Sequence, residues 1–346
     1  MDKPLGKPRV GILGLTLEFY EEASPGLRDD REAWVRSAIL PALEVVADVS
    51  FTKAVCRREE IDEVLAGYEA AGVDALLVIC LTYAPSQLSL PALKRTRLPI
   101  MLWNTQELFG VGKDYDGQLM SANHGVHGSQ DLANVLLRSD VRFKYVTSHL
   151  RDANGAEANG LRPLADFFQA AAAVGGLRRL GLGLLGYPFP GMGDFAVDST
   201  DLVDKFGCRM AQLPLSEYIG LAEAAPADEV AGLLTCYRDS FDVAEDVADE
   251  DLENTARAEW ALREMLAQRH IQAFSYQFLA FGEDDRVVTV PFIAACRMMA
   301  DGIGFGGEGD LIGATGTWLL NRLQSPASFS EVFTVDFEGN SLLMSH

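Results

Sequence analysis

The chain has 346 residues, of which 48% are hydrophobic and 23% charged, a composition that is ordinary for a globular protein of two or three domains. Its formal net charge of -21 argues against nucleic acid or an anionic membrane surface as a partner. No apolar run reaches the length of a transmembrane helix, and the N-terminal segment lacks the apolar core of a signal peptide. The five cysteines show no C-x-x-C spacing and are expected to be buried free thiols. We therefore expect a cytoplasmic protein.

The first half of the chain alternates short apolar runs with amphipathic stretches. The run VDALLVICL is apolar throughout, as strands buried on both faces of a parallel sheet are. Strands that alternate with helices predict a doubly wound, Rossmann-like α/β domain, which we expect to span residues 1–172. The patterns predict strands at residues 9–15, 49–55, 73–81 and 98–103, and helices at 29–48, 58–71 (closed by Gly72), 90–94, 129–138 and 161–173.

A second alternating pattern begins after the small-residue run AAAVGG and predicts another doubly wound α/β domain at residues 173–324. The loop YPFPGMGD at 187–194 follows a strand, at the edge of the sheet where open α/β folds bind ligands. The tail alternates with period two around a turn, a hairpin signal that we interpret as the start of an incomplete β-rich domain at 325–346. The predicted strands are 180–185, 271–280 and 287–290, and the predicted helices are 202–206, 227–234 and 252–268.

The most unusual stretch is PFIAACRMMADGIGFGGEGD, at residues 291–310. Pro291 and the apolar residues after it, at spacings of three and four, predict an amphipathic helix. Five of the eight residues at 302–309 are glycine, which argues against any regular element there and lets the backbone approach a ligand closely.

The glycines of this stretch form a literal G-x-G-x-x-G, but they do not indicate a dinucleotide site. The motif follows a helix rather than a strand, and Glu308 and Asp310 would repel a pyrophosphate. A carboxylate in a glycine-rich turn suits a cation better. On this stretch alone, a helix C-terminus followed by a solvated acidic turn is an equally good interpretation.

The string R-M-M-A-D-G-I-G-F-G-G-E-G-D resembles the L-arabinose isomerase and L-fucose isomerase superfamily. The arabinose isomerase branch reads R-L-M-A-x-G-Y-G-F and then G-E-G-D-W, and here Leu311 replaces the tryptophan. This resemblance implies that Glu308 is both a metal ligand and an acid/base catalyst.

The tail is similar to the family's S-F-x-E-D-Y, followed after a turn by G-S-H, in the residues Ser328, Phe329, Glu331, Ser345 and His346. The resemblance implies that Glu331 is a metal ligand and acid/base group and that His346 is a further metal ligand. A second histidine ligand lies downstream in the family, and we expect it beyond His346. Taken alone, Glu331 is better interpreted as a solvated strand residue.

The segment NHGVHG at 123–128 resembles the family's N-Q-x-x-H-G, although His124 stands in place of the glutamine. This implies that His127 contacts substrate from a neighbouring subunit, in a homotrimer or homohexamer with shared sites. Near Glu18 the family's substrate-facing Gln-His is absent, and Met192 falls near a substrate-contacting methionine. The resemblance thus implies substrate-binding positions at these four residues. The alternative is that the two histidines simply pack against a helix start.

Two carboxylates and imidazole nitrogens suit a hard or borderline divalent cation. We expect Mn²⁺, with Mg²⁺, Co²⁺ or Ni²⁺ as alternatives. Aldose–ketose isomerisation removes a proton next to a carbonyl and returns it to the adjacent carbon, through an enediolate that a cation stabilises. Glu308 and Glu331 are the expected base and acid.

The resemblance therefore implies a metal-dependent aldose–ketose isomerase, an intramolecular oxidoreductase acting on a free sugar that the sequence does not name. Two alternatives remain open. Altered residues near Glu18 and His124 favour a sugar epimerase or lyase that uses the same metal site. A non-catalytic sugar-binding protein would also pair two α/β domains, but it has no need of the paired Glu308 and Glu331.

Overall fold

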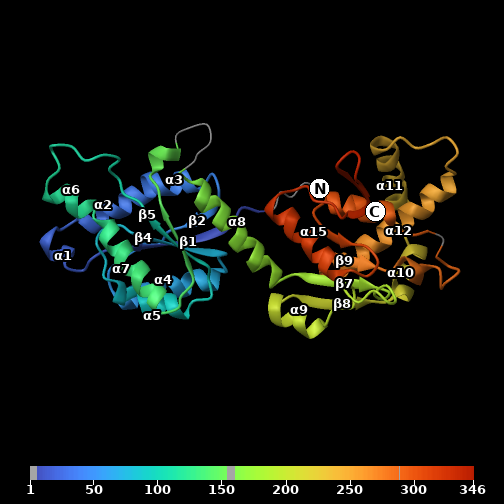
Figure 1. Cartoon of the computed structure of the whole chain (residues 1–346), viewed down its shortest axis with the longest axis horizontal. Helices are drawn as coiled ribbons and strands as arrows, with labels where there is room; N and C mark the ends of the chain where they lie inside the picture. Colours follow the sequence, from blue (N-terminus) through green and yellow to red (C-terminus); the bar gives the residue numbers. More distant parts are fainter. Residues whose placement is uncertain (1–5, 154–159, 288) are drawn as a thin grey trace. The chain divides into compact units, whose positions relative to one another are not determined.

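The computed structural model describes residues 6–153, 160–287 and 289–346, and the chain divides between Ala172 and Ala173 into two compact units (Figure 1). Each unit contains its own parallel sheet, which confirms the predicted α/β class. The predicted domain limits at residues 172 and 324 stay predictions. None of the described helices is both long and apolar enough to cross a membrane.

The unit of residues 5–172 is built on a six-stranded parallel sheet in the order β2-β1-β4-β5-β6, with β3 also paired to β1. The central strand β4 is buried along its whole length, as its apolar sequence predicts. The strands are β1 (Arg9–Leu15), β2 (Asp48–Ser50), β3 (Ala54–Val55), β4 (Ala75–Cys80), β5 (Ile100–Asn104) and β6 (Phe143–Thr147).

Helices cover both faces of this sheet. Buried side chains of α2 (Leu27–Trp34), the π-helix η1 (Val35–Ile39), α3 (Leu40–Leu43) and α8 (Arg162–Leu177) pack on one face. Those of α4 (Arg58–Ala71), α5 (Ser86–Arg95) and α7 (Gly125–Arg138) pack on the other. The remaining short helices are α1 (Tyr20–Ala23), α6 (Gly117–Ala122) and the 3-10 turn η2 (Leu150–Ala153).

The unit of residues 173–346 has a four-stranded parallel sheet in the order β10-β9-β7-β8. Its strands are β7 (Gly181–Leu185), β8 (Arg209–Leu213), β9 (Ala273–Tyr276) and β10 (Gly304–Gly306). One face packs on α10 (Leu215–Glu223), α12 (Asp249–Gln268) and α14 (Phe292–Ala300), and the other on α9 (Ser199–Phe206) and α15 (Leu311–Leu323). Two further helices are α11 (Ala227–Ser240) and α13 (Phe278–Phe281).

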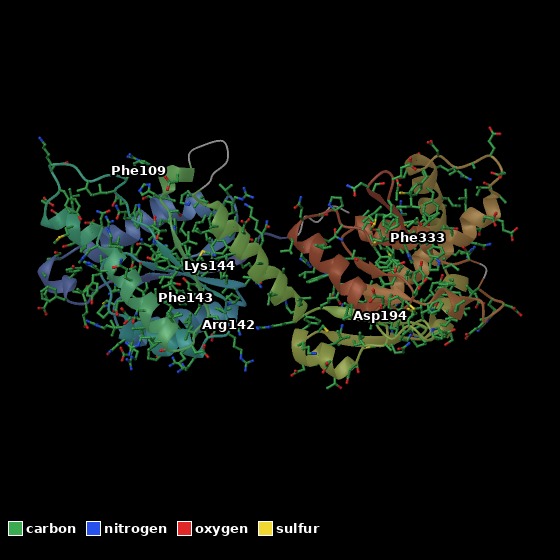
Figure 2. All side chains as sticks on the ribbon, in the orientation of Figure 1. Phe109, Arg142, Phe143, Lys144, Asp194 and Phe333 are labelled. Atoms are coloured by element: carbon green, nitrogen blue, oxygen red, sulfur yellow. The ribbon has the colours of Figure 1, made fainter. Side chains whose placement is uncertain are left out.

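The predicted tail hairpin is confirmed as β11 (Glu331–Asp336) and β12 (Ser341–Ser345), paired antiparallel. The Asp336 carboxylate fixes its turn by accepting hydrogen bonds from the N–H groups of Glu338 and Gly339, at 3.1 and 2.9 Å. Apolar side chains of the hairpin remain open to solvent, and Phe333 is 59% exposed (Figure 2).

Some local predictions were wrong. The glycine-rich stretch contains a regular strand, β10, because its glycines serve close packing rather than irregularity: a Cβ at Gly304 or Gly306 would collide with backbone of α15 or of the turn before it. Two edge strands, β6 and β8, were not predicted; neither is apolar throughout, and β6 bears the exposed Lys144 (Figure 2). The predicted strand at 287–290 does not form at its described positions.

Candidate functional site

The glycine-rich turn between β10 and α15 carries Glu308 at the carboxyl edge of the four-stranded sheet. Glu308 has φ of 59°, in the left-handed region that residues other than glycine rarely adopt. Its carbonyl oxygen accepts hydrogen bonds from the Phe189 N–H at 2.9 Å and from Gln277 Nε2 at 3.4 Å. Within the described residues its half-buried carboxylate forms no hydrogen bond or ion pair, so both oxygens are available to a ligand.

Ser275 of β9 holds this turn in place. Its hydroxyl donates to the Gly306 carbonyl at 2.6 Å and accepts from the Gly309 N–H at 2.8 Å. The sequence interpretation missed both Ser275 and Gln277 as positioning residues. The available signal was their polarity within the otherwise apolar string AFSYQF.

Asp310, two residues after Glu308, has a structural role. Its carboxylate accepts the Gly313 N–H at 2.8 Å and so caps the N-terminus of α15. Its own N–H donates to the Gly307 carbonyl at 2.8 Å, which closes the turn around Glu308. Asp310 therefore shapes the loop from its carboxyl end.

The hairpin brings the other two predicted ligands together. His346 Nδ1 lies 2.9 Å from Oε2 of Glu331, whose strand neighbour in the register is Ser345. The His346 ring stands edge-on to Phe329, with centroids 4.7 Å apart. A Cβ built on Gly307 would collide with His346 Nε2, so this imidazole lies against the residue next to Glu308.

Carboxylate oxygens and imidazole nitrogens are the donor atoms that the expected ligands supply. Glu331 and His346 offer a carboxylate oxygen and an imidazole nitrogen in mutual contact, and the imidazole lies against Gly307, the residue before Glu308. Such a set fits a hard or borderline divalent cation. Across residues 6–153, 160–287 and 289–346, however, no three His, Cys, Asp or Glu side chains already converge as a complete ligand cluster.

A pocket of about 490 Å³ adjoins the same imidazole. Apolar side chains make up most of its wall, and His346 and the hydroxyls of three serines add polar groups. The lining residues include Phe292, Cys296, Met299, Phe305, Phe329 and His346. Met192 is 41% exposed in the loop after β7, and this loop is tied to the turn by the hydrogen bond from Phe189 to Glu308.

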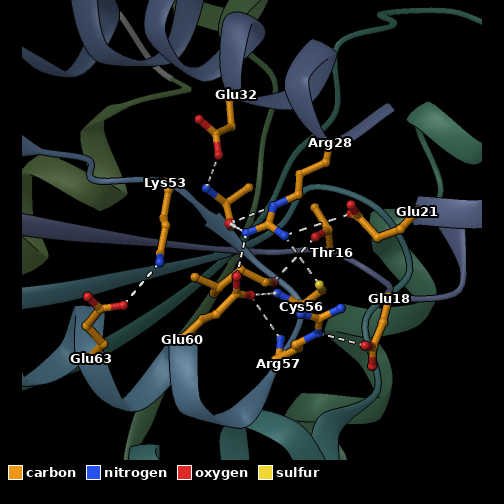
Figure 3. A network of polar contacts seen from close by, with 12 residues as sticks. Thr16, Glu18, Glu21, Arg28, Glu32, Lys53, Cys56, Arg57, Glu60 and Glu63 are labelled. Atoms are coloured by element: carbon orange, nitrogen blue, oxygen red, sulfur yellow. Dashed lines mark hydrogen bonds and ion pairs between the residues drawn. The ribbon is translucent and has the colours of Figure 1, made fainter. Parts of the chain in front are cut away.

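The remaining three predicted residues belong to the other unit, where Glu18 follows β1 and the two histidines lie at the start of α7. Glu18 is exposed and pairs with Arg57, with Oε1 2.7 Å from Nε (Figure 3). The loop that carries Glu18 is joined to the loop after β4 by the Leu17 N–H, which donates to Thr82 Oγ1 at 3.2 Å. Arg57 gives Glu18 a counter-ion that sequence reasoning did not identify.

A partly buried network fixes the backbone behind Arg57 (Figure 3). Arg28 donates to the Ala54 carbonyl at 2.6 Å and to Glu60 Oε1 at 2.9 Å. Glu60 Oε2 accepts the N–H groups of Cys56 and Arg57, at 3.0 and 3.2 Å. Burial alone would raise the pKa of Glu60, but these N–H donors and the Arg28 guanidinium outweigh it, so the pKa is lowered.

The two histidines of NHGVHG meet at the N-terminus of α7. His124 Nε2 and His127 Nδ1 are in hydrogen-bond contact, and the ring centroids are 4.4 Å apart. The glycines of the motif allow α7 to lie on the end of β4, because a Cβ at Gly125 would collide with the Cys80 carbonyl and one at Gly128 would lie 2.9 Å from the Ala84 nitrogen.

The structure thus groups the predicted residues in two sets. Glu308, Glu331, His346 and Met192 belong to the unit of residues 173–346. Glu18, His124 and His127 belong to the unit of residues 5–172. That the second set acts on a neighbouring subunit's site stays a prediction.

Comparison with known proteins adds independent information. Residues 190–323 match the family described as the L-arabinose isomerase central domain. Among curated proteins, the chain is 30% identical to the L-arabinose isomerase of a Nocardioides species over 238 residues, which cover 66% of this chain and 45% of that protein. It is 25% identical to the L-arabinose isomerase of Bacteroides thetaiotaomicron, over 82% of this chain and 58% of the relative.

A third relative, the L-arabinose isomerase of Geobacillus kaustophilus, is 27% identical over 90% of this chain and 62% of its own length. The matched region thus spans about half of the curated relatives. Among solved structures, the arabinose-binding periplasmic component of an ABC transporter from Shewanella sp. ANA-3 aligns over 92% of this chain and 88% of its own. Its sequence identity of 12% and TM-score of 0.22 support no conclusion about this chain.

Proposed function

We propose that this chain, which belongs to the L-arabinose isomerase family, provides the catalytic residues of a metal-dependent aldose–ketose isomerase that acts on a free sugar. The family assignment supports the reaction class. The observation that carries the proposal is the approach of His346, in contact with Glu331, to the turn that bears Glu308.

Glu308, Glu331 and His346 would hold the divalent cation, most simply Mn²⁺. When bound, such a cation supplies Lewis-acid stabilisation for negative charge on neighbouring sugar oxygens. Glu308 projects from a turn whose backbone is held by Ser275 and Gln277, so the backbone position from which its side chain extends is fixed. Fixed placement of this kind lowers the entropic cost of proton transfer.

The two carboxylates divide the proton transfer between them. One removes the proton from the carbon beside the sugar carbonyl, which leaves an enediolate. The proton of the neighbouring hydroxyl passes to the former carbonyl oxygen, and the carbon-bound proton returns to the former carbonyl carbon. Glu308 suits the base, because within the described residues its carboxylate has no other partner. Glu331 takes the proton-returning role, and its Oε2 lies 2.9 Å from Nδ1 of His346.

Substrate contacts are proposed for Glu18, His124, His127 and Met192, and assembly for a homotrimer or homohexamer. The resemblance of the segment NHGVHG to the family's motif supports a site completed by a second subunit. Light scattering combined with activity measurement tests this part. A fully active monomer would contradict it.

The reaction itself is tested with the natural protein, a panel of aldoses and ketoses that includes L-arabinose, and added Mn²⁺. We expect an aldose to yield the ketose of the same mass, with solvent deuterium incorporated when the reaction runs in D₂O. Conversion to another aldose would favour the epimerase, and cleavage into two fragments the lyase. Saturable sugar binding without any turnover would leave the non-catalytic binding protein as the better function.

A further inference from the structure

The contact between His124 and His127 restricts how these rings carry their protons. His124 precedes the first turn of α7 and His127 lies within it, and Nε2 of the first faces Nδ1 of the second. A hydrogen bond between two ring nitrogens needs one proton, shared by one donor and one acceptor. Two arrangements are therefore available, and the burial of the other nitrogens distinguishes them.

The deciding atom is Nδ1 of His124, which is buried and has no hydrogen-bond partner among the described residues. If His127 donated through Nδ1, neutral His124 would have to carry its proton on that buried Nδ1, without an acceptor. Buried N–H groups without acceptors are rarer than buried acceptors without donors, and each costs about 1–3 kcal/mol. The favoured arrangement places the proton of His124 on Nε2, from which it donates to His127.

A positive charge on His124 is opposed by its surroundings. Burial lowers the pKa of His124, and the neighbouring His127 ring lowers it further. The partial positive charge at the N-terminus of the 14-residue helix α7 acts in the same direction.

We propose that His124 is a positioning residue, which donates its Nε2–H to Nδ1 of His127 and so holds His127 in the tautomer that carries its proton on Nε2. His127 is exposed, and its ring then presents an N–H donor at the far edge. Because a neutral histidine has only one ring proton, fixing one nitrogen as acceptor fixes the other as donor.

This inference rests on the proposed function only for its consequence, which is that His127 donates a hydrogen bond to a sugar oxygen. A sugar hydroxyl can accept from an N–H or donate to a bare nitrogen, so an unfixed ring would bind it in two competing ways. Fixing the tautomer removes one of them. The pair therefore acts on substrate orientation rather than on proton transfer.

The test is a long-range ¹H–¹⁵N NMR spectrum of the protein with labelled histidine at neutral pH. The chain has five histidines, so the ring signals are few enough to assign by single substitutions. His149 is an internal reference, because its Nδ1 accepts the Arg151 N–H at 2.9 Å and its Nε2 faces the Glu107 carbonyl at 3.2 Å, which fixes the Nε2–H tautomer. We expect the His127 nitrogens to match those of His149.

Two variants separate positioning from simple packing. His124→Gln retains an N–H donor and should keep the His127 signals unchanged. His124→Leu removes the donor and should move the two His127 ring signals toward each other, as the tautomers exchange. A His127 proton on Nδ1 in the wild type, or unchanged His127 signals in His124→Leu, would overturn the proposal. If His124→Leu fails to fold, the wild-type and His124→Gln spectra still decide it.

A kinetic measurement then addresses the consequence separately. With a sugar that the protein converts, His124→Leu should raise KM about tenfold with little change in kcat. A tenfold change corresponds to about 1.4 kcal/mol, which is the contribution of one well-made hydrogen bond. His124→Gln should reverse most of the KM increase that His124→Leu causes. If no sugar is converted, the proposed function fails while the tautomer assignment stands on its spectra.

Discussion

Gly307 and His346 share one space: the imidazole of His346 occupies the position that a side chain at Gly307 would fill. The relationship connects the end of the hairpin to the turn that carries Glu308, across 39 residues of sequence. It explains why the residue before Glu308 has no side chain. It also identifies a substitution that would displace His346 without altering any proposed ligand.

Gly307→Ala should weaken Mn²⁺ binding about 10- to 100-fold, because the added methyl group pushes the His346 ring away from Glu331. The ring is the far end of a side chain and can move, so the free energy of unfolding should change little. Titration calorimetry with Mn²⁺ and urea denaturation measure the two effects. Gly316→Ala is the matched control, since nothing lies within 4 Å of its added Cβ in α15. Equal Mn²⁺ affinity in Gly307→Ala and the wild type would contradict the proposed ligand set.

Glu308→Gln should reduce turnover by about 10²- to 10⁴-fold, because the amide is not basic and cannot take the proton. Glu283→Gln, in the turn after α13, should stay close to wild type, since the Tyr187 hydroxyl can still donate to the remaining oxygen. Asp310→Asn should be mild because asparagine also caps helices. Steady-state kinetics on the converted sugar compare the three. If Glu308→Gln were active and Glu283→Gln inactive, the assignment of the catalytic carboxylate to Glu308 would be wrong.

Glu308→Gly should lose activity and yet be at least as stable as the wild type. Glycine adopts the left-handed φ of 59° without strain, which should stabilise the fold by about 1–2 kcal/mol. The greater backbone entropy that glycine loses on folding costs about 0.5–1 kcal/mol and offsets part of this gain. His270→Gly, at φ of 53° in the turn after α12, should show a similar stability change with activity intact. Urea denaturation provides the free energies. A Glu308→Gly protein clearly less stable than the wild type would show that its side chain serves folding instead.

Glu259→Ala should destabilise the unit of residues 173–346 by about 3–5 kcal/mol. Its carboxylate is fully buried and binds the Tyr237 hydroxyl at 2.7 Å, Arg263 Nε at 2.8 Å and Arg297 Nε at 3.0 Å. Removing it leaves two guanidinium groups without their central anion. Thermal unfolding measures the loss, with Glu253→Ala, which breaks an exposed pair with Arg257, as the near-neutral control. Similar losses in both variants would refute the central role of Glu259.

Glu60 should make the stability of the unit of residues 5–172 depend on pH. Its folded pKa is lowered from 4.5, so its contribution is complete above that value and is lost as the pH falls toward the folded pKa. From about pH 6 to about pH 4, the wild type should therefore lose more free energy of unfolding than Glu60→Gln. Urea titrations of the two proteins give the difference. A Glu60→Gln protein with the same pH dependence as the wild type would exclude this contribution.

Strong local patterns predicted their elements well. Helix α4 begins at Arg58 and ends at Ala71 as expected, because Gly72 takes the left-handed conformation that stops a helix. The fully apolar run of β4 and the turn of the tail hairpin were equally clear. In each case the signal lies within about ten neighbouring residues.

The failures have a common physical origin in contacts between distant residues. β10 exists because α15 packs on its glycines, and composition alone indicated an irregular turn. Within the candidate site, Ser275 lies 34 residues before the Gly309 N–H that it accepts, and Glu18 lies 39 residues before Arg57. Family resemblance identified the candidate ligands, but the residues that position them depend on how the chain folds back.

Gly125 and Gly128 also determine the reactivity of Cys80. Because they let α7 lie on the end of β4, the thiol is enclosed, and burial raises its pKa to about 12. A thiol reagent reaches it only when the helix lifts from the strand, whereas the exposed Cys296 reacts without any opening. The ratio of the labelling rate of Cys80 to that of Cys296 therefore measures how often α7, the helix that begins at the histidine pair, opens.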